Sequence, residues 1–209
     1  RDLSHINDKL NEEVILRHQL EAEQLSRNAI LEALAKGEDF REILTDIVRG
    51  AEKQNPEMIC SILLLDEKAE HLHHGAAISL PGFYTEAIDG VTIGEGVGSC
   101  GTAAFTAKQV IVEDIMTHPY WAPYKELAKS AGLYACWSEP ILSSKNKVLG
   151  TFAIYYQEVK APTKENLGFI KRMADLTAIT IERKQTEDEL RIAATTFQSH
   201  DAVVITDVN

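Results

Sequence analysis

The feature that most constrains the fold of this chain is a stretch, residues 3–36, that contains neither proline nor glycine. Its apolar residues recur at steps of three and four, which predicts a long amphipathic helix. They are Leu3, Ile6, Leu10, Val14, Leu20 and Leu34. At about 1.5 Å per residue the helix would extend roughly 50 Å, and its apolar stripe is narrow. We therefore expect residues 1–36 to be a signalling helix that pairs in a coiled coil; the alternative is a surface helix folded back on its own domain.

Short apolar runs alternate with turn residues across the central segment, residues 37–182. Asp39 can cap a helix that ends near Gln54. Strand-like runs then occupy residues 58–65, 71–78, 110–112, 133–142 and 148–156. Shorter helical runs and a glycine-rich loop, residues 94–101, separate them. This order predicts an α+β domain with an antiparallel sheet of about five or six strands and helices on both faces, flanked by long coiled-coil helices.

A last helix is expected beyond Pro162, with Thr163 as its N-cap, and it runs into a charged stretch that ends near Arg191. Because this helix overshoots the domain, residues 183–196 are expected to act as a second signalling helix. The apolar run at residues 202–206 is typical of a first strand. We expect residues 197–209 to begin a further, truncated domain.

Charge and composition exclude several classes of function. The chain carries 32 acidic against 21 basic residues, so its field repels phosphate backbones and disfavours nucleic-acid binding. No apolar run reaches the roughly 18 residues that span a bilayer, so no direct membrane insertion is expected. Three cysteines, none in a CxxC pair, suit neither a disulfide framework nor a zinc site. A cytoplasmic location fits these features.

Four segments together carry a resemblance to the GAF domain family. They are residues 94–104 (GEGVGSCGTAA), 110–115 (VIVEDI), 135–141 (ACWSEPI) and 148–152 (VLGTF). The flanks, residues 1–4 and 197–209, resemble the end and the beginning of PAS domains. A PAS–GAF–PAS order is similar to bacterial sensors that end in a diguanylate cyclase, a cyclic di-GMP phosphodiesterase or a histidine kinase. The resemblance implies a regulatory sensor and relay module without catalytic residues of its own, whose output domain lies outside this sequence.

The GAF resemblance also implies a ligand pocket on one side of the sheet. Trp121 and Tyr124 lie in the segment that covers this pocket, and Pro119 and Pro123 suggest a mobile cover. Cys100 and Thr102 would contribute from the glycine loop, with Trp137 and Ser138 from the strand below. The aromatic residues could equally fill a core. The ligand and any cofactor stay unknown, because cyclic nucleotides, haem, oxo-acids or no ligand are all compatible with the fold.

Two other motifs favour structural interpretations. The glycine loop matches GxGxxG, with Glu113 as a candidate ribose ligand, but the following helix is too short for a nucleotide-binding crossover. Its glycines are better explained by tight backbone turns. His71, His73 and His74 are expected to be exposed hairpin residues and not metal ligands, and no metal site is predicted.

Cys100 opens a short helix, where the helix dipole favours a thiolate. The loop around Cys100, together with Cys136, resembles free methionine-R-sulfoxide reductase, with Asp114 and Glu139 at acidic positions of that enzyme. The match breaks where its strand carries two aspartates, because Ala153 and Tyr155 stand there. A redox enzyme and a purely structural dimerisation spacer are therefore the alternatives to a sensor.

The resemblance also brings the two thiols to the same side of the sheet. We expect Cys100 and Cys136 to be near neighbours without a stable bond. We also expect Cys100 to be more reactive than Cys60, which lies inside an apolar strand.

Overall fold

The computed structural model describes residues 13–14, 17, 21, 24–25, 27–33 and 35–204, with residues 196–204 described by backbone only. Its strands form one six-stranded antiparallel sheet in the order β3-β2-β1-β6-β5-β4. The strands are β1 (Ile59–Leu65), β2 (His71–Ala77), β3 (Val91–Thr92), β4 (Val110–Val112), β5 (Ala135–Leu142) and β6 (Val148–Tyr156). The helices are α2 (Phe40–Gln54), α3 (Gly82–Ile88), α4 (Gly98–Thr106), the 3-10 turn η1 (Pro119–Trp121), α5 (Lys125–Ser130) and α6 (Lys164–Val204). The predicted α+β class and strand number are confirmed.

Local capping chemistry fixes the starts of the two helices that flank the sheet. The Asp39 carboxylate accepts hydrogen bonds from the backbone of Arg41 and Glu42, which satisfies two free N–H groups of α2. At α6, the Thr163 hydroxyl accepts from the Asn166 backbone while the Asn166 amide oxygen accepts from the Thr163 backbone, at 3.2 and 3.0 Å. Both predicted caps are present.

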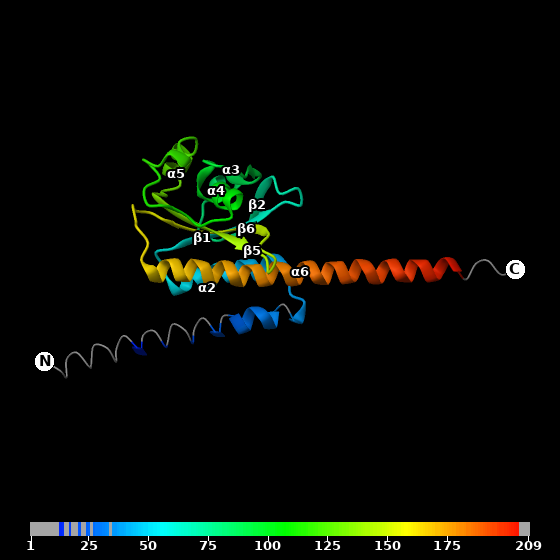
Figure 1. Cartoon of the computed structure of the whole chain (residues 1–209). Helices are drawn as coiled ribbons and strands as arrows, with labels where there is room; N and C mark the ends of the chain where they lie inside the picture. The colour runs from blue at the N-terminus through cyan, green and yellow to red at the C-terminus, as the bar shows by residue number, and fades with distance from the viewer. Residues whose placement is uncertain are drawn as a thin grey trace.

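Helices cover both faces of the sheet (Figure 1). α2 and α6 lie together on one face, and their core includes Phe152 and Ile154 of β6. α3, α4 and α5 lie on the other face, over Ala153 and Tyr155 of the same strand. Because successive strand residues point to opposite faces, β5 and β6 contribute to both cores.

Gly150 allows the central strands β1 and β6 to approach closely. It pairs with Leu64, and a Cβ atom at this position would lie 2.1 Å from the Leu63 carbonyl oxygen. No side chain can be accommodated there without a backbone shift, which explains the glycine in this part of the sequence.

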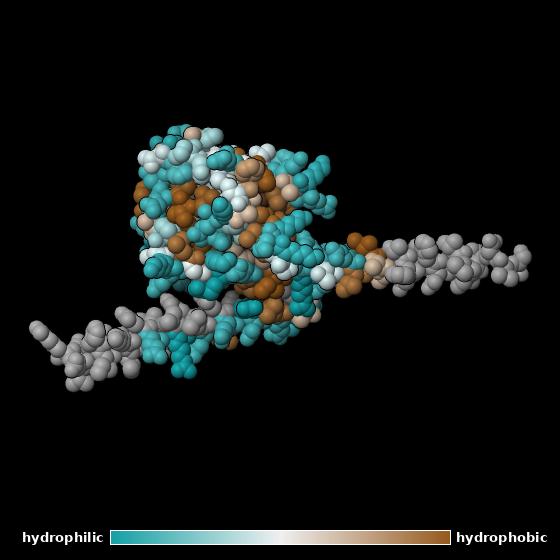
Figure 2. Space-filling view, in the orientation of Figure 1, coloured by the Kyte–Doolittle hydropathy of each residue, from teal (hydrophilic) through white to brown (hydrophobic). Residues whose placement is uncertain are grey.

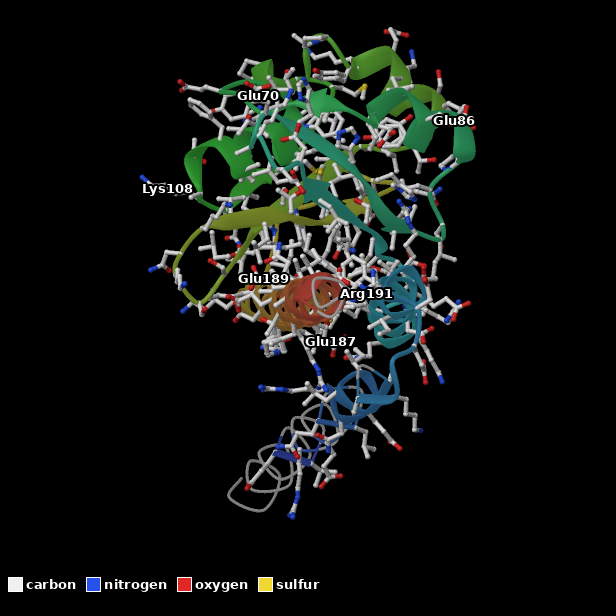
Figure 3. The ribbon with its side chains drawn as sticks, turned by 90° about the vertical axis from the view of Figure 1, so that its right-hand side faces the viewer. Glu70, Glu86, Lys108, Glu187, Glu189 and Arg191 are labelled. Carbon is white, nitrogen blue, oxygen red and sulfur yellow. The ribbon has the colours of Figure 1, made fainter. Side chains whose placement is uncertain are left out.

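α6 extends well beyond the sheet, as predicted, and the view along it shows Glu187, Glu189 and Arg191 on the extension (Figure 3). The prediction of a strand at residues 202–206 is wrong over residues 202–204, because these belong to α6. Local β propensity is overridden there by continuation of a helix that has no stop signal. Residues 205 and 206 lie outside the described residues.

The N-terminal helix is described only in part. Residues 27–33 and 35–36 are helical, and Ile30 is buried against the α2 and α6 core, so this end of the helix packs on its own domain. Of the predicted apolar stripe, all but Val14 lies outside the described residues. Coiled-coil pairing stays a prediction. In the part of the chain that is described, no helix is long and apolar enough to cross a membrane.

Candidate functional site: an aromatic pocket beside a thiol pair

A small pocket lies between α3, the start of α4, η1 and the sheet. Its volume is about 40 Å³. Its walls are mostly aliphatic and aromatic, and Cys100 is the thiol among them. The lining residues are Leu63, Tyr84, Ile88, Val91, Val97, Gly98, Ser99, Cys100, Gly101, Trp121, Tyr124 and Tyr155. A space of this size admits a molecule of only a few heavy atoms unless the walls move.

Trp121 and Tyr124 lie at the pocket, as the sequence predicts. Their rings pack edge to face with centroids 6.4 Å apart. Trp121 is only 4% exposed, and its indole nitrogen donates to Ser99 Oγ at 3.0 Å. Ser99 Oγ in turn donates to the Cys136 carbonyl at 3.2 Å. This chain of hydrogen bonds ties η1 to α4 and β5, so Trp121 closes the pocket as a hydrogen-bonded wall. Its mobility stays a prediction.

Thr102 stabilises the glycine loop through hydrogen bonds and does not line the pocket. Its hydroxyl donates to the Gly98 carbonyl at 2.7 Å and accepts from the Gly96 backbone at 3.1 Å. Gly96 and Gly98 have φ angles of 82° and 55°, a region that favours glycine. The glycines therefore serve the tight turn into α4, in agreement with the structural interpretation of this motif.

Cys100 and Cys136 lie in the same core beneath α4, where they are near neighbours as expected, and neither forms a disulfide. The neighbouring Cys136 thiol is the main cause that lowers the pKa of Cys100 to about 7. The hydroxyls of Ser138, Thr151 and Tyr155 act in the same direction, while burial opposes them. For Cys136, burial and then the neighbouring Cys100 raise the pKa well above its usual range. Cys100 is thus the thiol that ionises first.

Three buried hydroxyls gather beneath the thiols on neighbouring strands. Ser61 and Ser138 both lie beside Ala153 in the strand register, and Thr151 precedes it by two positions on β6. The oxygens of Ser61, Ser138 and Thr151 have no hydrogen-bond partner among the described residues. Buried hydroxyls without such partners are uncommon. Ser138 and Thr151 are among the groups that lower the pKa of Cys100, because an unpaired hydroxyl nearby can turn its proton toward the thiolate when this forms.

Trp137 does not line the pocket, which corrects the prediction made from the sequence. It is fully buried on the α6 side of the sheet, where its ring packs on Tyr156 at 4.6 Å. Its indole nitrogen donates to the Lys160 carbonyl at 3.2 Å. Neighbouring residues on a strand face opposite sides, so Ser138 lies on the pocket side of the sheet, but it does not line the pocket either.

Glu139 and Asp114, the acidic residues of the reductase resemblance, are engaged elsewhere. Glu139 also faces α6, accepting from Gln109 at 2.6 Å with Lys171 at 4.0 Å. Asp114 binds the Met116 backbone and the Thr117 hydroxyl, at 2.9 Å each. Neither carboxylate is among the groups that line the pocket.

Sequence reasoning missed four residues of this site: Tyr84, Ser99, Thr151 and Tyr155. Tyr84 and Tyr155 are both fully buried and pack edge to face with centroids 5.9 Å apart. For Thr151 and Tyr155 the sequence did contain a signal. Residues two apart on a strand lie on the same face, so both residues lie on the face of Ala153. The positions of Tyr84 and Ser99 depend on how α3 and α4 dock, which no local pattern specifies.

The hairpin histidines form carboxylate pairs and no metal cluster. His71 Nδ1 lies 3.2 Å from Asp66, and His73 Nδ1 lies 3.5 Å from Asp89. No group of three or more possible metal ligands occurs among the described residues. The two carboxylates were not identified as partners from the sequence.

A six-stranded antiparallel sheet with paired flanking helices on one face and a small pocket on the other defines a GAF-type domain. A profile of the GAF domain family matches residues 37–182. The chain belongs to this family. It is 41% identical over 181 residues to a methyl sulfide methyltransferase-associated sensor of Methanosarcina acetivorans, a match that covers 86% of this chain and 18% of that protein. The chain therefore spans less than a fifth of the relative's length.

Solved structures of GAF domains share the fold. The GAF domain of a phosphoenolpyruvate-protein phosphotransferase from Coxiella burnetii superposes with a TM-score of 0.64 at 16% identity, covering 81% of this chain and 98% of that one. Free methionine-R-sulfoxide reductase of Neisseria meningitidis gives a TM-score of 0.62 at 15% identity, covering 80% and 90%. At these identities the likeness concerns the fold alone.

Proposed function

We propose that this chain is a regulatory sensor and relay module, in which a small molecule or a chemical change in the pocket alters the position of α6. One observation carries the proposal: the pocket and α6 lie against opposite faces of β6, and β5, whose other face also packs on α6, is hydrogen-bonded to the pocket wall through Ser99. Ser138 and Tyr155 lie on the pocket side, while Glu139 and Ile154 lie on the α6 side. A shift of these strands therefore reaches both sites.

Direct contacts link the strands to α6. Lys171 of α6 lies 4.0 Å from Glu139 of β5. Further along, Glu182 accepts hydrogen bonds from the backbone and hydroxyl of Ser144, in the turn between β5 and β6, at 3.0 and 2.7 Å. A strand shift beneath the pocket changes the geometry of these contacts. Packed elements of this kind favour discrete alternative arrangements, which is what a signal relay requires.

The proposal extends to a parallel homodimer formed by the N-terminal helix and α6. A dimer would convert movement of α6 into a change of helix pairing for a following output domain, of the cyclic di-GMP or histidine kinase type. The relative named as a sensor supports a signalling role. A cytoplasmic location is part of the same proposal.

The reductase alternative is disfavoured by the pocket itself. The positions that would hold two carboxylates are Ala153 and Tyr155, and Glu139 points to the opposite face of the sheet. A structural spacer is the remaining alternative. It predicts that a change in the pocket does not affect α6.

Hydrogen exchange on a pocket-filling variant tests the relay. Val91 lines the pocket from β3, away from α6. We expect Val91→Phe to alter amide exchange in the domain-bound part of α6, residues 164–182, by severalfold. The matched control is Val159→Phe, at a loop position that is 60% exposed. A folded Val91→Phe protein whose exchange changes only around the pocket would support the spacer.

A further inference from the structure

The thiol in the pocket wall lies beside a second thiol and close to three buried hydroxyls. Cys100 contacts the pocket, while Cys136 lies behind it and is 0% exposed. The Tyr155 hydroxyl is 3.8 Å from the Cys100 sulfur. Ser138 and Thr151, both fully buried, have no hydrogen-bond partner among the described residues, and both lie close enough to Cys100 to affect its ionisation. This arrangement exceeds what two core-filling cysteines require.

We propose that Cys100 is an oxidation site for a small uncharged peroxide and that Cys136 resolves the product to a disulfide. This inference deepens the proposed function and rests on it for the meaning of the oxidised state as a signal. The site itself, a reactive thiol with its resolving partner, stands on the geometry of the pocket.

The pocket selects this class of substrate by size and polarity. A volume of about 40 Å³ accommodates hydrogen peroxide, which has two heavy atoms, but no larger metabolite without movement of the walls. Leu63, Val91 and Val97 present apolar surface, where a charged molecule would lose hydration without compensation. A neutral peroxide avoids this cost.

The reaction balances with the groups present. The Cys100 thiolate attacks one peroxide oxygen, the O–O bond breaks, and the leaving hydroxide takes up the proton released when Cys100 ionised, forming water. Cys136 then attacks the resulting sulfenic acid, an S–S bond forms, and the S–O bond breaks. The departing hydroxide and the Cys136 proton form a second water. In total, two thiols and one peroxide yield one disulfide and two waters, and a dithiol reductant reverses the change.

The Cys100–Cys136 disulfide would join the start of α4 to strand β5 of the sheet. Cys136 lies three residues before Glu139 on β5, and Ser99, next to Cys100, already bonds the Cys136 carbonyl. The two free sulfurs must come closer to reach the disulfide bond length of about 2 Å. Oxidation therefore draws α4 toward β5, the strand that contacts α6.

Mass-spectrometric mapping of the full chain tests the proposal. The reduced protein is treated with equimolar hydrogen peroxide, alkylated and digested, with dimedone present in a parallel sample. We expect a Cys100–Cys136 disulfide at least tenfold more abundant than any product at Cys60, which is also fully buried but faces α2 and α6. Cys136→Ser should accumulate dimedone-labelled Cys100, and Cys60→Ala should behave as the wild type.

The outcomes separate this proposal from the relay. If folded wild-type protein forms neither the disulfide nor a Cys100 sulfenic acid, the oxidation site is refuted, even where Val91→Phe still alters exchange in α6. Oxidation of Cys60 at a comparable rate would refute it too. If the disulfide forms but exchange at residues 164–182 is unchanged, the oxidation site stands and its signalling role fails.

Discussion

Ser138 and Glu139 are neighbours in the sequence, yet their side chains meet different chemistry. Ser138 lies under α4 and lowers the pKa of Cys100, whereas Glu139 meets Gln109 and Lys171 on the other side of the sheet. Alternation along one strand thus gives a thiol site and a helix contact only one residue apart. At this scale, the reactivity of Cys100 depends on individual hydrogen-bond donors.

The first prediction concerns Ser138→Ala. Removing a donor to the thiolate should raise the pKa of Cys100 above about 7, so less of it is ionised at neutral pH. We expect alkylation by iodoacetamide at pH 7 to slow by about threefold to fivefold, partly offset by the greater nucleophilicity of a more basic thiolate. The alkylation rate of Cys100, followed by mass spectrometry from pH 5 to 9, gives the shift directly.

The matched control is Ser61→Ala, which removes a buried hydroxyl from the same face of the sheet. Ser61 is not among the groups that lower the pKa of Cys100. Its alkylation profile should stay close to that of the wild type. Equal slowing in both variants would mean that general loosening, and not a donor to the thiolate, controls Cys100.

At the scale of elements, local signals predicted most of the fold. The Asp39 and Thr163 caps and the turn at residues 143–147 are short-range patterns, and the structure has them where expected. The pocket was predicted less well. Because neighbouring strand residues point to opposite faces, only one of Trp137 and Ser138 can face the pocket. Which of the two does so depends on how α4 and α6 dock on the sheet. Docking is a long-range property, and so are the positions of Tyr84 and Ser99.

The contact between β5 and α6 gives a pH-dependent prediction at Glu139. Burial raises the pKa of this carboxyl above its usual range, while Gln109 and Lys171 act in the opposite direction. The folded state therefore holds the proton more tightly than the unfolded state. This contribution to stability is complete below the unfolded pKa and is lost as pH rises through the folded pKa. Glu139→Gln should raise the urea midpoint at pH 7.5 and change it little at pH 4.0.

A carboxylate with the opposite behaviour provides the control. Lys160 donates to Glu57 at 2.7 Å and lowers the pKa of that exposed carboxyl. Its contribution is present above the unfolded pKa and is lost as pH falls. Glu57→Gln should therefore give no gain at pH 7.5. A Glu139→Gln protein less stable than wild type at pH 7.5 would show that the ion pair with Lys171 outweighs the burial cost.

At the scale of the whole molecule, α6 carries apolar residues past the end of the sheet. Leu190 is 66% exposed, and Leu25 on the N-terminal helix is 71% exposed. Figure 2 shows hydrophobic side chains on α6 where it extends beyond the domain. Scattered apolar residues are normal on protein surfaces. Their position on two helices that run outside the compact domain is what favours pairing with a second copy.

The last prediction tests this pairing by combining Leu25→Glu and Leu190→Glu. In a parallel homodimer each substitution places like charges at a buried seam, so the variant should sediment as a monomer at concentrations where the wild type is dimeric. Val159→Glu adds the same charge at a loop position of similar exposure, 60%, and should leave the dimer intact. A wild-type chain that is already monomeric at high micromolar concentration would remove the basis for signalling through paired helices, because α6 would then have no second copy against which to shift.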